Sequence, residues 1–159
     1  MYNNKTTIGL IFDKSYIIYD VLVPMDIIFT IMSHNKESNF VYGGIPRLCM
    51  HVEEDAVSLE ILNSQLHRVC LPCDERVLTR ASIEWTKEVM KYKPDKIFLF
   101  RDNSHSTETM GLCLEAQKIG IPVMEFDERG HARDITTGTP SDLNPYFIKQ
   151  PGRVTNDDF

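Results

Sequence analysis

Asp95-Lys96-Ile97-Phe98-Leu99-Phe100 ends in four consecutive apolar residues, and the polar stretch from Arg101 to Thr107 follows it directly. A continuous apolar run of this kind is typical of a central strand in a parallel sheet, which helices cover on both faces. From Glu108 to Ile119 the apolar residues recur at helical spacing and Gly120 follows, which predicts a helix with a glycine stop. Pro122 to Phe126 forms a further short apolar run. The order strand, loop, helix, strand predicts a parallel βαβ unit.

The same alternation continues toward the N-terminus. Three more short apolar runs predict strands at residues 7–12, 39–44 and 68–72. Helical spacing predicts helices from Asp20 to about Met32 and from Glu53 to Leu66, and a loop followed by a helix is expected between Cys73 and Tyr92. The sequence therefore predicts an α/β fold, a Rossmann-like three-layer sandwich with a mainly parallel sheet of about five strands and right-handed crossovers.

The length and composition fit one folded domain. The chain has 159 residues, of which 42% are hydrophobic and 25% charged, as in ordinary globular proteins. We expect residues 1–127 to form the Rossmann-like domain and residues 128–159, rich in glycine, proline and polar residues, to form an irregular C-terminal tail. The apolar patch Tyr146-Phe147-Ile148 in this tail favours homo-oligomerisation.

Charge and hydropathy exclude several classes of partner. The net charge is −6 and the basic residues are scattered, so the chain lacks the basic face that binding to a nucleic acid requires. The apolar stretches end well before the ~20 residues that a membrane span needs, and the N-terminus lacks the features of a signal peptide. We therefore expect a cytoplasmic protein without a membrane or nucleic-acid partner, whose four cysteines are reduced thiols.

Cys70-Leu71-Pro72-Cys73 is a Cys-x-x-Cys motif, which occurs in redox pairs and in zinc sites. A redox pair requires a thioredoxin-like context, and a zinc site requires two more ligands, for which Cys49 with His51 or His67 would have to converge. Packing of these cysteines in a strand and a loop is the favoured interpretation. The sequence predicts no metal site and no cofactor.

Ligand-binding residues are expected at one edge of the sheet. In an open parallel sheet, ligands bind beyond the carboxyl ends of the strands, where the loops after Ile11, Tyr42 and Phe100 lie. The loop after Phe100 offers hydroxyl groups at a helix N-terminus, where backbone N–H groups and the helix dipole favour an anion. The predicted ligand-binding residues in these loops are Asp13, Lys14, Ser15, Gly43, Gly44, Arg101, Ser104, Ser106 and Thr107.

The motifs in these loops resemble those of the SLOG superfamily. The resemblance rests on Phe100–Thr107, on Ala-Gln-Lys-Ile-Gly-Ile-Pro-Val at 116–123 and on Val41-Tyr42-Gly43-Gly44. Asp55-Ala56 resembles the family's Asp-x-x-Ala helix start, displaced by an insertion around Pro46 to Glu53, which adds Asp55 to the expected ligand-binding residues. The resemblance implies a Rossmann-like, oligomeric protein that binds a nucleotide or a nucleotide-derived small molecule, like nucleotide-sensing domains and the lysine-decarboxylase-like phosphoribohydrolases.

Departures from the family pattern leave the activity open. The phosphoribohydrolase signature Pro-Gly-Gly-x-Gly-Thr-x-x-Glu is absent, and Ser106 replaces a loop glycine. Cleavage of an N-glycosidic bond would still need a carboxylate to hold water or the ribose, for which Asp102 and Glu108 are the catalytic candidates, with His105 as a donor. Three functions follow: a sensor or sequestering protein, an N-glycosidic hydrolase of nucleoside monophosphates, or an interaction protein with a degenerate pocket.

Overall fold

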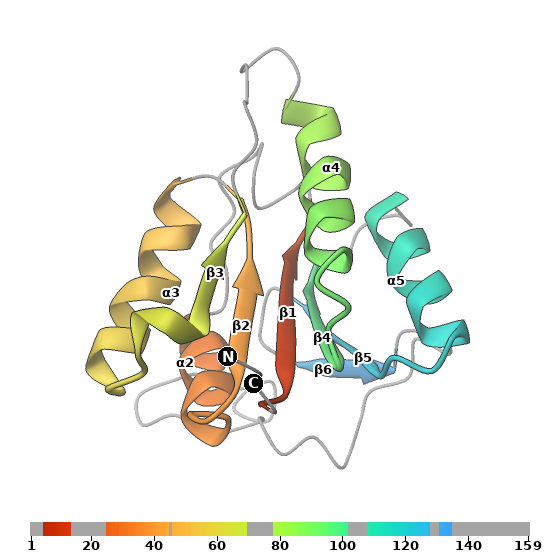
Figure 1. Ribbon diagram of the computed structural model, residues 1–159. Coiled ribbons are helices and arrows are strands. Elements are labelled where there is room, and N and C mark those ends of the chain that lie inside the picture. Colours follow the sequence, from red (N-terminus) through yellow and green to blue (C-terminus); the bar gives the residue numbers. More distant parts are fainter. Residues whose placement is uncertain are drawn as a thin grey trace, which may run out of the picture.

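The computed structural model describes residues 5–13, 25–44, 46–69, 78–101, 108–127 and 131–134. In this part of the chain, six strands form one sheet in the order β3-β2-β1-β4-β5-β6 (Figure 1). Strands β1 to β5 pair in parallel, and β6 pairs antiparallel with β5. The strands are β1 (Thr7–Phe12), β2 (Asn39–Tyr42), β3 (Leu66–Arg68), β4 (Lys96–Phe100), β5 (Val123–Phe126) and β6 (Ala132–Asp134). The predicted α/β fold with a mainly parallel sheet is confirmed.

Helices cover both faces of the sheet. Helices α2 (Met25–His34) and α3 (Pro46–Ser58) contact each other, and the hydroxyl of Tyr42 in β2 donates a hydrogen bond to Glu53 of α3. On the opposite face, α4 (Leu78–Met90) packs on β1 where Gly9 faces Val89, and α5 (Glu108–Lys118) lies beside α4 (Figure 1). The three layers are therefore α2 with α3, the sheet, and α4 with α5.

The core consists of the apolar strands and the inner sides of the helices. Every residue of β1 after Thr7 is buried, and so is every residue of β2, because helices exclude water from both faces. In α2 the side that packs inward consists of Ile27, Ile28, Ile31 and Met32, whereas Phe29 is 41% exposed. Trp85 of α4, the single tryptophan of the chain, is also buried.

The predicted second helix was wrong at both ends. Helix α3 begins at Pro46 and ends at Ser58, and a short 3-10 helix, η1 (Asn63–Gln65), leads into β3. Proline is favoured in the first turn of a helix because the N–H that it lacks has no intrahelical acceptor there. The segment 46–53 is thus the first half of α3, where Leu48, Cys49 and Val52 are buried at helical spacing, and not an insertion before it.

The sheet extends beyond residue 127, where the sequence placed the end of the domain. Strand β6 pairs with β5 in the register Phe126↔Ala132 and Met124↔Asp134. The backbone N–H of Asp127 donates to the carbonyl of His131, which closes the connection between the two strands. The predicted tail from residue 135 onward, including Tyr146 to Ile148, and the Cys-x-x-Cys motif at 70–73 lie outside the described residues.

Candidate functional site

The sheet order places its topological switch point, which we call the crevice, between the carboxyl ends of β1 and β4. The chain leaves β1 toward β2 on one side, and β4 lies on the other side of β1, so the connections diverge between these two strands. In open parallel sheets, ligands bind at such a topological switch point. Asp13 and Arg101 are the first residues after the two strands. The Asp13 N–H donates to the carbonyl of Phe100 (2.9 Å), so the two strand ends remain paired up to the crevice.

Charged side chains are buried at this edge on the face that α4 and α5 cover. Side chains alternate along a strand, so residues two positions apart lie on the same face. Ile11, Leu99 and Glu125 are paired in register across β1, β4 and β5. The residues two positions after them therefore lie on the same face of the sheet. That face is the one on which Gly9 faces α4. The buried charged residues there are Asp13, Arg101, Glu125 and Asp127.

Arg101 and Glu125 form an ion pair inside the protein. Arg101 Nε donates to Glu125 Oε1, and only 8% and 3% of the two side chains are exposed. A buried guanidinium requires such a partner because an isolated charge is costly to remove from water. The sequence predicted Arg101 as a ligand-binding residue. In the structure its side chain binds Glu125 of β5, and its backbone N–H donates to the carbonyl of Phe126 (3.0 Å).

Helix α5 lies above these carboxyl groups. Burial, together with the negative charges of Asp13 and Glu125, raises the pKa of the Cys113 thiol to about 12. A thiol with this pKa is protonated at neutral pH and is not a nucleophile. Cys113 therefore acts as a small apolar group that packs α5 over the charged cluster, and Thr109 of the same helix is buried beside the sheet as well.

The opposite face of the same edge is aromatic. The rings of Phe12 and Phe100 stack at 5.2 Å between centroids, and those of Phe100 and Phe126 stack at 5.6 Å. The three residues come from the last positions of β1, β4 and β5, which are neighbours in the sheet. Large buried rings that stack in this way leave little room for rotamer changes.

Side chains of the protein core fill the space beside Gly43. A Cβ atom at Gly43 would lie 2.5 Å from Val69 Cγ2 and 2.8 Å from Trp85 Cδ1, so the close approach that this glycine permits is made by the core. Gly44 has a φ of 156°, a backbone conformation that side-chain-bearing residues rarely adopt, and it leads into the first turn of α3. The sequence predicted a ligand at this pair of glycines; the contacts of Gly43 have a packing origin.

Asp55 lies far from the crevice along α3. The helix starts next to the carboxyl end of β2, and nine residues of helix carry Asp55 roughly 13 Å along the axis toward the opposite edge of the sheet. The sequence predicted that Asp55 lies at the start of this helix, and the structure shows that this prediction was wrong. Burial and the charge of Glu54, partly offset by His51, raise the pKa of Asp55 to about 6.

The other predicted site residues divide into two groups. Glu108 is the first residue of α5 and is exposed, where a carboxylate compensates the helix dipole. Outside the described residues lie Lys14, Ser15, Asp102, Ser104, His105, Ser106 and Thr107. Of the predicted ligand-binding residues, the structure thus brings Asp13 and Arg101 together.

The sequence missed two buried carboxylates of this edge, Glu125 and Asp127. Glu125 is the single charged residue within the short run that predicted β5, and an acid inside a buried strand is a signal that a partner lies nearby. Asp127 accepts a hydrogen bond from the His131 N–H (2.9 Å), and its second oxygen lies 3.8 Å from the His131 ring.

Among the described residues no three metal-binding side chains gather at one point, and none of the described helices has the length and hydropathy to cross a membrane. Comparison of the chain with protein-family models, with curated proteins and with solved structures found no match.

Proposed function

We propose that this protein binds a nucleotide or a nucleotide-derived small molecule at the carboxyl ends of β1 and β4, as a sensor or a sequestering protein. The observation that carries the proposal is the topological switch point, where Asp13 and Arg101 follow two adjacent central strands. The motif resemblance to nucleotide-binding domains supports the same edge. The expected homo-oligomer is part of this proposal.

The charge balance favours one orientation of the ligand. Asp13, Glu125 and Asp127 bring three carboxylates to the edge, and the guanidinium of Arg101 is engaged with Glu125. An ionised carboxylate only accepts hydrogen bonds, so it suits ribose hydroxyls or a base amino group and repels a phosphate. The sugar or base end of the ligand should therefore lie toward Asp13, and any phosphate should lie toward the N-terminus of α5, away from Asp13, Glu125 and Asp127.

Titration calorimetry and native mass spectrometry with adenosine monophosphate, ADP-ribose and a cyclic dinucleotide test this proposal. Loss of a charge-assisted hydrogen bond costs about 1.5–3 kcal/mol, so Asp13→Asn should weaken binding of the best ligand by about 10- to 100-fold. The matched control is Asp95→Asn. Asp95 Oδ2 accepts from the Thr7 N–H (2.8 Å) at the opposite edge of the sheet, and this variant should bind normally.

The products of the same incubation separate the remaining functions. A ligand recovered unchanged at stoichiometric occupancy supports a sensor or sequestering protein. Release of a free base would make the protein an N-glycosidic hydrolase. Absence of both binding and turnover across the set would refute the proposal and favour an interaction protein.

A further inference from the structure

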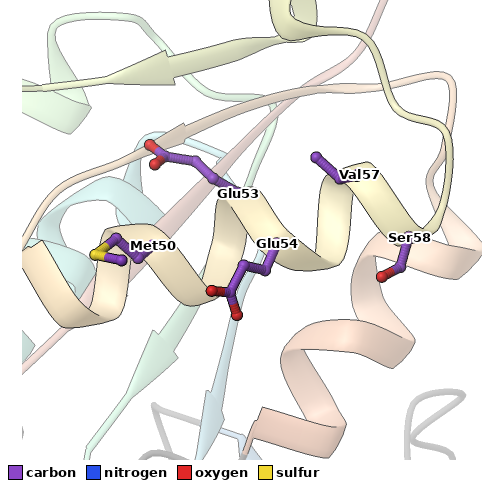
Figure 2. Close-up of a pocket in the computed structure, with 5 residues that line it drawn as sticks. All are labelled: Met50, Glu53, Glu54, Val57 and Ser58. Carbon is purple, nitrogen blue, oxygen red and sulfur yellow. The ribbon is translucent and has the colours of Figure 1, made fainter.

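The outward side of α3 carries a hollow that is separate from the crevice. Its volume is about 480 Å³, and Figure 2 shows that the residues lining it come from successive turns of this one helix. Two apolar side chains in it are unusually exposed, Met50 at 53% and Val57 at 75%. The described residues that line it are Met50, Glu53, Glu54, Val57 and Ser58.

The charges of the hollow are negative. Glu53 Oε2 accepts a hydrogen bond from the Tyr42 hydroxyl (2.7 Å) and lies 3.6 Å from Arg68 Nε. These two contacts with β2 and β3 hold the carboxylate in place. Glu54 is exposed, and the structure shows no ion pair for it within the described ranges. Since the described residues that line the hollow include no cation, this part of the surface repels a nucleotide phosphate and suits an apolar segment that carries basic residues.

We propose that residues 146–153 of the same chain dock on this hollow. Their sequence is Tyr-Phe-Ile-Lys-Gln-Pro-Gly-Arg, with three adjacent apolar residues followed by Lys149 and Arg153. Between Asp142 and Asp157 the sequence has no acidic residue, although the whole chain has a net charge of −6. The apolar residues complement Met50 and Val57, and the cations complement the acidic hollow. This inference is independent of the ligand proposed for the crevice.

The chain is long enough for this contact to be intramolecular. Asp134 is the last described residue, in β6, and the twelve residues to Tyr146 can span up to about 40 Å. Four strand intervals separate β6 from β2, on whose face α3 packs, a distance of roughly 19 Å across the sheet. A tether of this length gives an effective concentration of about millimolar, which favours the same chain over a second copy. Direct pairing of two α3 hollows would also oppose their glutamates.

The test is an NMR contact in the full-length chain. In protein labelled with ¹³C at the methionine methyl groups, we expect nuclear Overhauser effects from the Met50 methyl to the rings of Tyr146 or Phe147. Lys149→Glu should abolish them, and Glu54→Lys together with Lys149→Glu should restore them. As a matched control, Glu115→Lys, an exposed position on α5, should not restore them. Circular dichroism checks that every variant is folded.

A mixed sample separates the two origins of the segment. One chain is labelled at methionine and deuterated at phenylalanine and tyrosine, and the other chain is unlabelled. Overhauser effects that persist in this mixture would come from a second copy and would overturn the intramolecular contact. Absence of the effect in the uniformly protonated sample would overturn docking on α3 altogether, whatever the crevice binds.

Discussion

Removing the guanidinium of Arg101 should destabilise the protein more than any surface substitution. Arg101→Met leaves Glu125, which is 2% exposed, without its ion-pair partner. Loss of one partner of a buried pair costs about 3–5 kcal/mol. For a chain of 159 residues this lowers Tm by roughly 6–20 °C.

The reciprocal variant, Glu125→Met, should also cost about 3–5 kcal/mol, because it removes the ion-pair partner of the buried Arg101 guanidinium. The double variant Arg101→Met with Glu125→Met should be close to the wild type, because an apolar pair of similar volume replaces the buried ion pair without stranding a charge. Little solvent screening applies, since both side chains are less than a tenth exposed.

Urea unfolding followed by tryptophan fluorescence measures these differences, because Trp85 is the single tryptophan and is buried in the core. The control is Lys91→Met, which removes the exposed pair with Glu88 and should leave the midpoint unchanged. The reasoning is refuted if either single variant loses less than about 1 kcal/mol, or if the double variant loses as much as the sum of the two.

Three smaller effects should be measurable by the same unfolding assay. Gly43→Ala should cost about 1–3 kcal/mol because its methyl group would collide with the side chains that pack there, whereas Gly111→Ala, with nothing within 4 Å, should gain up to about 1 kcal/mol in the middle of α5. Tyr42→Phe should lower the free energy of unfolding by about 1 kcal/mol through the lost hydrogen bond to Glu53. An unchanged free energy of unfolding would show that this hydrogen bond does not stabilise the fold. Burial raises the pKa of Asp55 from 3.8 to about 6, so the stability that its protonated form contributes is complete below about pH 4 and is lost as the pH rises through 6. Asp55→Asn should lack this fall between pH 4 and 6, and an identical fall in the variant would contradict the assignment.

The sequence by itself determined the layers of this protein. Runs such as Ile97 to Phe100 exclude water on both sides only in a covered parallel sheet, and helical spacing between them supplies the covering helices. Both signals are local, because they follow from the geometry of a strand or helix over a few residues. The rule that ligands bind beyond strand ends then located Asp13 and Arg101 at the crevice without any knowledge of their contacts.

The boundaries of two elements needed the tertiary structure. Strand β6 has three residues without apolar alternation, and it forms because β5 offers an edge with which it can pair. The first half of α3 was obscured by the glycines and the proline before it, which are equally compatible with a turn or with a helix start. Packing of Leu48 and Val52 against the core stabilises the helix over a turn at this position.

Only the tertiary structure decided which charges meet. Arg101 and Glu125 are 24 residues apart, and their contact depends on the pairing of β4 with β5 in one register. A shift by one residue would turn Glu125 to the opposite, aromatic face, and no periodicity in the sequence fixes that choice. The sequence determines which residues are buried because burial follows from local pattern, whereas the partners of a buried charge follow from the register between distant strands.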